Sequence, residues 1–440
     1  MQPNFLFIAW SPMFLSASTY STGERKTFRL HLIYSIIEGV ILGVLALNEF
    51  VFIKSLHGSN YQLGVLFQLS MVVFIFLIFI NEFIKRARDK KKLLRWTGIA
   101  TRGPLVLLMF FPASYEAMEG SYMYHYIFLT LFLVYYFGNV VIYPLINLFL
   151  KKQYAHENFG KLYGYASSAN KIVMLVATFL YGLLLDLDNF AFRYVFIVVA
   201  ILGIVSLHLL SLIDYSEKLA ERRDRFFESV RKSYRTMTDI LKGNKPYLHF
   251  EAGFMFYGFS FMITVTVITI LFEHALHLNY SSVAFYKNAY NILAIVLLPF
   301  TGKLLGKIDP RNFAIITFGS LTLFITFIML TDFFPYHINF RGIELYPMLI
   351  IADLFYGVFA ATMALLWFIG SAYFCKPEEA GDYQSVHLSL TASRAMFAPL
   401  FGVFFYELFG FTGTFVLAIA SLLFGILLMG WSYRRDRKAR

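Results

Sequence analysis

Charged residues are scarce in this chain of 440 residues. Asp, Glu, Lys and Arg make up only 15% of it, whereas about 25% is usual for a soluble domain. Hydrophobic residues reach 58%, and the mean hydropathy is +0.63. This balance excludes a soluble fold of this length. The one cysteine, Cys375, excludes a disulfide framework and a cysteine-based metal site.

Motifs that carry chemistry are also missing. The sequence has no glycine-rich phosphate loop, no zinc-type histidine spacing and no convincing Ser-His-Asp arrangement. The histidines His31, His125, His208, His249 and His387 are scattered singly. We therefore expect no enzyme, no cofactor and no metal. The net charge of +11 does not indicate nucleic acid, because the basic residues cluster between apolar segments, as they do beside a lipid bilayer.

Long apolar runs are what the chain does contain. A membrane-spanning helix needs about 20 apolar residues, and backbone polar groups in lipid must be satisfied within the segment. The runs are continuous and not alternating, which predicts an all-α membrane protein with twelve transmembrane helices. They lie near residues 30–53, 61–84, 95–113, 123–150, 160–185, 193–213, 248–272, 282–305, 312–331, 346–374, 383–406 and 412–433.

Lysine and arginine predict the orientation of these helices. Every second connection is basic, from residues 85–95 to the tail 434–440, and the opposite connections are nearly uncharged or acidic. Both termini are therefore expected to be cytosolic, in a bacterial inner (plasma) membrane. The apolar stretch Phe5–Leu15 is too short to span, so residues 1–29 are interpreted as a cytosolic or interfacial arm.

A hydrophilic stretch divides the spans six and six. We predict an N-terminal six-helix bundle at 30–213, a cytosolic linker at 214–247 and a C-terminal bundle at 248–433. The linker has the spacing of an amphipathic helix, which suits either a helix lying on the lipid surface or a solvated tether. Short motifs recur at an offset of about 220 residues, and internal repeats are typical of transporters. Asn60-Tyr61 and Asn279-Tyr280 are one such pair.

With these twelve runs, the hydrophilic middle stretch and the internal repeats, the chain resembles the major facilitator superfamily over nearly all of its length. The family has two six-helix bundles, a long cytosolic middle loop and a basic signature loop after the second span. Residues 81–90 match that loop in its basic residues but lack its glycines and have no aspartate at the position of the motif aspartate. The resemblance implies gating roles for Arg86 and Lys307. It implies the same for Asp186 and Arg193 in the connection between the fifth and sixth spans.

Two cations at mid-depth are the main candidates for substrate binding. Lys171 and Arg394 each lie about 15 Å into a span, one in each half. A charge at that depth is costly, so it is expected to face a cavity or a partner. In the resembling family these spans border a central cavity, so the pair is interpreted as a clamp for an anion. The alternative is that each forms an internal ion pair.

Two carboxyl groups are candidates for proton coupling. Glu38 is near the middle of the first span, where it suits a proton carrier or a partner for Lys171 or Arg394. Asp353 is nearer the outer face and suits a second proton site or an outer-gate ion pair. Arg102, Glu251 and Lys287 are expected nearer the membrane surfaces. Arg102 can extend its side chain toward water, and lining the outer mouth is the alternative for Lys287.

Uncharged polar residues gather on three spans. They either line a wet cavity or bond between helices, and we take the following as candidate substrate contacts: Tyr136, Asn139, Tyr143, Asn288, Asn291 and His387.

The leading hypothesis is a proton-coupled transporter of a small organic anion that works by alternating access, functional as a monomer. Its partners would be a small-molecule substrate, protons and the lipid bilayer. Among transporters, the alternative is a drug or lipid exporter whose apolar pocket is lined by Phe and Tyr residues. A membrane-embedded enzyme or receptor that moves no solute is the alternative outside the transporters.

Overall fold

The computed structural model describes residues 20–119, 121–215, 226–376 and 379–439. Within these ranges the chain is almost entirely helical, with one antiparallel hairpin of β1 (Ile338–Phe340) and β2 (Ile343–Leu345). Helices satisfy their own backbone hydrogen bonds in lipid, and the all-α expectation is confirmed. Most of the predicted N-terminal arm lies outside the described residues.

The first half of the chain forms one group of packed helices, the N-terminal bundle. It contains α2 (Thr22–Leu45), α3 (Asn48–Lys54), α4 (Asn60–Val72), η1 (Val73–Phe76), α5 (Leu77–Arg86), α6 (Lys90–Arg102), η2 (Gly103–Phe110), α7 (Tyr115–Glu119), α8 (Tyr122–Gln153), α9 (His156–Leu187) and α10 (Phe192–Ser211). Helices α2 and α9 pack closely because glycines line the contact. A Cβ atom on Gly39 would lie 2.6 Å from the carbonyl oxygen of Asn170.

The second half forms the C-terminal bundle. It contains α12 (Lys245–Ile270), η3 (Leu271–Ala275), α13 (Tyr280–Leu305), α14 (Pro310–Phe333), the hairpin, α15 (Pro347–Ile369), η4 (Ser371–Phe374), α16 (Ala380–Ala395) and α17 (Ala398–Ala439). Helix α11 (Phe226–Gly243) precedes it and packs against α5 and α16.

The described residues hold nine helical segments that are long and apolar enough to cross a membrane. The difference from twelve runs has local causes. The second and third spans contain the 3₁₀ segments η1 and η2, and Pro104 in η2 cannot donate a backbone hydrogen bond. The last two spans join into one segment that turns at Gly410, whose φ of 67° favours glycine.

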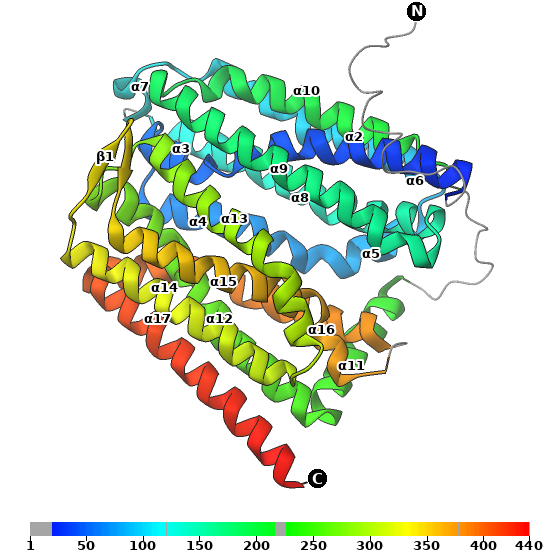
Figure 1. Ribbon diagram of the computed structural model, residues 1–440. Helices are drawn as coiled ribbons and strands as arrows, with labels where there is room; N and C mark the ends of the chain where they lie inside the picture. Colours follow the sequence, from blue (N-terminus) through cyan, green and yellow to red (C-terminus); the bar gives the residue numbers. More distant parts are fainter. Residues whose placement is uncertain (1–19, 120, 216–225, 377–378, 440) are drawn as a thin grey trace, which may run out of the picture.

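The two ends of the molecule differ (Figure 1). One end carries the β1–β2 hairpin, α3 and α7, and is called the hairpin end below. The other carries α11, the start of α2 and the end of α17, and is called the linker end. Side chains begin the helices that start at the hairpin end: Ser59 caps α4 and Asn279 caps α13.

Candidate functional site

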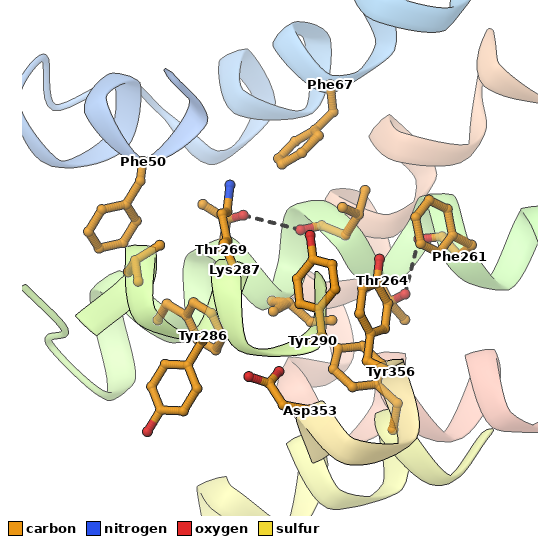
Figure 2. Close-up of a pocket in the computed structure, with 15 residues that line it drawn as sticks. Phe50, Phe67, Phe261, Thr264, Thr269, Tyr286, Lys287, Tyr290, Asp353 and Tyr356 are labelled. Carbon is orange, nitrogen blue, oxygen red and sulfur yellow. Dashed lines mark hydrogen bonds between the residues drawn. The ribbon is translucent and has the colours of Figure 1, made fainter. Parts of the chain in front are cut away.

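A cavity of about 170 Å³ lies between the two bundles (Figure 2). The C-terminal bundle supplies most of its wall, and Phe50 of α3 and Phe67 of α4 close it from the N-terminal bundle. The remaining lining residues are Phe261, Thr264, Val265, Ile268, Thr269, Phe272, Val283, Tyr286, Lys287, Tyr290, Phe324, Asp353 and Tyr356. It is thus largely aromatic, with one acid and one base.

The acid of the cavity wall is Asp353 of α15. No described residue forms a hydrogen bond with its buried Oδ2 atom, and it is the only carboxyl group in the wall. An unpaired carboxylate in such surroundings is unfavourable, and either a proton or a cationic ligand removes that cost. Of the two roles expected for Asp353, the described residues provide no ion-pair partner for an outer gate, and the role as a second proton site stays a prediction.

The base, Lys287 of α13, is already compensated. Its ammonium group donates to the carbonyl oxygen of Ala46 and lies 3.7 Å from a carboxylate oxygen of Glu49. Figure 2 shows the amino group turned toward the helices of the N-terminal bundle and away from Asp353. The expectation that Lys287 is interfacial is corrected: it lines the cavity and bridges the bundles.

The aromatic rings of the wall pack against one another. The Tyr290 and Tyr356 rings meet edge to face at a centroid distance of 4.5 Å, and Tyr356 lies 4.4 Å from Phe324. The Tyr286 hydroxyl donates to the carbonyl oxygen of Glu344 at 2.9 Å. Such contacts hold the rings in fixed positions, so that they form a preorganised surface.

Polar contacts join the bundles between the cavity and the hairpin end. The Lys54 ammonium lies 2.9 Å from Glu273 Oε2 and donates to the carbonyl oxygen of Leu278 at 3.0 Å. Beside it, Ser55 Oγ and the Tyr280 hydroxyl are 2.5 Å apart. Lys54 is the last residue of α3 and Ser55 follows it. Both therefore contact the C-terminal bundle near the connection between η3 and α13.

Asp186 of α9 contacts the start of α13. Its two carboxylate oxygens accept from the backbone N–H groups of Tyr280 at 2.7 Å and Ser281 at 2.9 Å. A negative charge at a helix N-terminus is favourable. Gly182 permits this approach, because a Cβ there would lie 3.0 Å from the Tyr280 carbonyl oxygen.

A second contact runs between α4 and α17. Asn60 Nδ2 donates to Glu407 Oε1 at 2.7 Å, and Gln68 donates to the carbonyl oxygen of Met396. Gly64 lies between them in α4, and the side chains of Leu400 and Val403 pack against it: a Cβ on Gly64 would lie 3.2 Å from a methyl carbon of each. These contacts of α4 add to those that Lys54, Asp186 and Lys287 make across the bundles.

Lys171 and Arg394, the expected clamp, do not line this cavity. Arg394 is 2% exposed and donates to the Phe254 carbonyl oxygen at 2.6 Å, inside the C-terminal bundle. Lys171 of α9 is exposed. It lies on the same helix face as Leu175, four residues later, and the Leu175 carbonyl oxygen accepts a hydrogen bond from Asn288 of α13. Within the C-terminal bundle the Arg394 guanidinium also lies 5.8 Å from the Tyr257 ring, and its buried Nε atom has no hydrogen-bond partner among the described residues. The clamp is corrected because neither Lys171 nor Arg394 lines the cavity between the bundles.

Arg102 and Glu38 belong to the interior of the N-terminal bundle. Arg102 is 2% exposed and donates to the Tyr135 carbonyl oxygen at 2.7 Å and to Asn139 Oδ1 at 2.8 Å. Glu38 Oε1 accepts from Ser206 Oγ at 2.8 Å. The expectation that Arg102 reaches water is wrong, and the Asn139 side-chain oxygen accepts from Arg102 inside the bundle.

His387 and Glu251 form a buried pair in the C-terminal bundle. His387 Nδ1 is 3.1 Å from Glu251 Oε2, and the side chains are 1% and 2% exposed. This corrects the interfacial position expected for Glu251, and it removes His387 from the cavity wall.

The other expected residues take separate places. Asn291 donates to the carbonyl oxygen of Lys287 in its own helix, Tyr136 packs on Phe132 and Tyr135, and Tyr143 is 46% exposed beside Phe74.

Among the expected gating residues other than Asp186, Arg86 lies 3.9 Å from Glu82, Arg193 donates to the carbonyl oxygen of Met109 at 3.5 Å, and Lys307 is exposed. None of these lines the cavity.

Sequence reasoning missed the charges that join the bundles at the hairpin end. Glu49, Lys54 and Glu273 each lie at the end of an apolar run, where a charge usually just faces water. Their signal was weak: the connection after the first span carries Glu49 and Lys54, and the connection after the seventh carries Glu273, which is opposite in charge to Lys54.

The architecture is that of a two-bundle membrane transporter with a cavity between its bundles. The family model described as Major Facilitator Superfamily matches residues 28–392. The chain belongs to the major facilitator superfamily, which confirms the resemblance, and its class is transporter and not enzyme.

Solved structures agree on the fold. A nucleoside transporter, NupG, aligns with a TM-score of 0.66 at 12% identity, covering 94% of this chain and 99% of that one. A structure from work on proton-dependent oligopeptide transporters gives 0.64 at 13%, covering 93% and 99%. A D-xylose–proton symporter gives 0.62 at 13%, covering 92% and 96%. A search of curated protein sequences found no match.

Proposed function

We propose that this chain is a secondary active transporter that moves a small organic solute across the membrane by alternating access. The observation that carries the proposal is the cavity between the bundles, which holds the unpartnered carboxyl group of Asp353. A solute in this cavity touches both bundles, because Phe50 and Phe67 face the C-terminal bundle across it.

The contacts that join the bundles support a rocking motion. They are ion pairs and hydrogen bonds at the ends of rigid helices, such as Lys54–Glu273 and Asp186–Tyr280. They can be exchanged for water without unfolding any element. Opening the hairpin end would break them and expose the cavity on that side. The single chain contains the whole cavity, so we propose that it acts as a monomer.

The basic connections support the linker end as the cytosolic side. Arg434, Arg435, Arg437 and Lys438 end the described chain there. The conformation described is then closed toward the outside.

Protons are the proposed coupling ion, and Asp353 is the proposed carrier. Glu38, the other candidate, already accepts a hydrogen bond from Ser206 inside its bundle, whereas Asp353 has no donor and lies where a solute would bind. Protonation of Asp353 would therefore respond directly to solute binding. The proton-coupled relatives named above have the same fold.

Transport into liposomes tests this function. Purified protein is reconstituted, a pH gradient is imposed, and a metabolite pool is assayed by mass spectrometry for solutes whose internal amount changes relative to empty liposomes. We expect at least one solute to move with the wild type and its gradient-driven accumulation or depletion to be lost with Asp353→Asn. Asp332→Asn is the matched control, because Asp332 lies in the same bundle but is exposed and outside the cavity wall. Loss of gradient dependence in Glu38→Gln but not in Asp353→Asn would reassign the carrier.

An anionic solute is the second candidate. Exposed Lys171 is on the same side of α9 as Leu175, whose carbonyl contacts Asn288 of α13, but it lies outside the wall of the cavity that holds Asp353. Anion transport that depends on Lys171 but not on Asp353 would support it.

A further inference from the structure

We infer that the cavity binds a small organic cation, an amine or ammonium compound whose charged end contacts Asp353 and whose apolar part lies among the aromatic rings. This inference rests on the proposed function and names the substrate class for the same cavity.

The charges of the wall carry the first step. The Lys287 ammonium group pairs with Glu49 and donates to the Ala46 carbonyl oxygen, both in the N-terminal bundle. Asp353 has no compensating group among the described residues. A ligand that enters the cavity therefore meets one available carboxyl group and no available cation. A carboxylate ligand would add a second acid beside Asp353, whereas an ammonium group would supply the donor that it lacks.

The aromatic residues carry the second step. Tyr290 and Tyr356 line the cavity together with Asp353, as Figure 2 shows, and the two rings are locked edge to face. Aromatic faces attract cations through their quadrupoles, and cages of such rings recognise ammonium groups. Phe50, Phe67 and Phe324 add apolar surface for the rest of the ligand.

The volume carries the third step. A dry apolar cavity of about 150 Å³ is large enough for benzene, and the cavity here measures about 170 Å³. A ligand with one ring or a short branched chain fits this volume, which points to a metabolite-sized amine.

The same carboxyl group would then serve two ligands in turn. A proton and an ammonium group both remove the cost of the unpaired charge on Asp353, and they cannot do so together. The other titratable groups around the cavity are Tyr286, Lys287 and Tyr290 of α13 and Tyr356 of α15, with Glu49 of α3 behind Lys287. Since Lys287 and Glu49 pair with each other, Asp353 is the group on which proton and amine compete, and the amine is moved in exchange for a proton.

Three probes of one shape test the charge preference. Benzylamine, benzyl alcohol and benzoate present a cation, a neutral group and an anion on the same ring. Their binding to purified full-length protein is measured by calorimetry. Benzylamine is expected to bind best, and its affinity is expected to rise as the pH is raised from 5.5 to about 7.5, because fewer protons then compete for the carboxyl group.

Asp353→Asn is expected to lower benzylamine affinity about 10- to 100-fold, the usual range for losing a charged hydrogen-bond partner. It should leave benzyl alcohol little changed, and Asp332→Asn should behave as the wild type. Tyr356→Leu, which keeps Asp353, is expected to weaken benzylamine more than benzyl alcohol. Thermal denaturation of each variant without ligand verifies folding.

Preference for benzoate, no binding of benzylamine, or equal binding by wild type and Asp353→Asn would each overturn the inference. None of these results bears on whether the protein transports. Liposomes that move a neutral or anionic solute would leave the proposed function intact while the cation assignment fails, and liposomes that move nothing would contradict the function itself.

Discussion

Lys54 of α3 and Glu273 of η3 form an ion pair of 2.9 Å that joins the two bundles at the hairpin end. The two residues are 219 positions apart in the chain, close to the offset at which the halves repeat. Their side chains are 23% and 21% exposed, so water screens the pair only in part. The pair stabilises the closed hairpin end without any covalent link and is suited to open and reform.

Glu273→Gln is the first prediction. Removing the charge is expected to weaken closure of the hairpin end by about 1 kcal/mol, or about fivefold in the ratio of closed to open molecules. Spin labels at Glu116 of α7 and Arg341 of the hairpin, in a Cys375→Ser background, would report the distance between the bundles. Both positions are exposed, and we expect a larger population at longer distances.

Lys26→Gln is the control for this change. Lys26 pairs with Asp214 at 2.8 Å within the N-terminal bundle, and both side chains are more than half exposed. It should leave the distance distribution unchanged. Identical distributions for Glu273→Gln and the wild type would show that the ion pair does not hold the bundles together.

Asp186→Ala is the second prediction. The substitution removes the carboxylate that accepts from the N–H groups of Tyr280 and Ser281 across the bundles. Losing such a helix-start contact usually costs about 1–2 kcal/mol, and the same labels should report a more open hairpin end. Asp188→Ala is the matched control, since Asp188 accepts from Phe190 N within its own bundle. It should lower the melting temperature without separating the labels, and a separation equal to that of Asp186→Ala would argue against a specific latch.

The helices and their family could be predicted from the sequence because apolar length is a local property. Depth along a helix followed from the same counting, which is why Asp353 is a candidate on the sequence alone, whereas Asp186 is a candidate through the family resemblance. The direction in which a side chain points around its helix did not follow, because it depends on which helices pack together. Arg394 and Lys171 have similar depths, yet Arg394 points into its own bundle and Lys171 is exposed.

Arg102 illustrates the same limit. Counting from the end of the third span put it within reach of water, but the Tyr135 ring, 3.7 Å from the guanidinium carbon, and the Asn139 amide hold it inside. Both partners are more than 30 residues away in the chain, and no periodicity within one helix links them. Gly203 of α10, which leaves space for the Arg102 side chain, is also distant from it in the chain.

Gly258→Ala is the third prediction. An added Cβ would lie 1.9 Å from the guanidinium carbon of Arg394, so Arg394 would have to leave its place against α12. Overpacking of this kind usually costs about 1–3 kcal/mol, and a buried arginine that loses its carbonyl partner adds to the cost. We expect a clear fall in the melting temperature of the purified protein.

Gly319→Ala in α14 is the control, because nothing lies within 4 Å of its added Cβ, and it should be neutral or slightly stabilising. Equal melting temperatures for the two variants would mean that Arg394 moves freely.

The pair of His387 and Glu251 gives the fourth prediction, which concerns stability inside the C-terminal bundle. Both side chains are almost fully buried, and the His387 ring also packs edge to face on Trp367 and Phe254. Removing one member of a buried pair leaves the other without compensation and typically costs about 3–5 kcal/mol. We therefore expect His387→Leu and Glu251→Leu each to lower the denaturation midpoint strongly.

The double variant His387→Leu/Glu251→Leu distinguishes a coupled pair from two independent packing residues. If the single losses arise from an uncompensated partner, removing both polar groups replaces the pair by apolar side chains, and such replacements are often neutral or stabilising. The double variant should then be more stable than either single variant, a non-additivity that a double-mutant cycle measures directly. Losses that simply add would mean that the two side chains act through packing alone. In that case Trp367 and Phe254, and not Glu251, would be what keeps His387 in place.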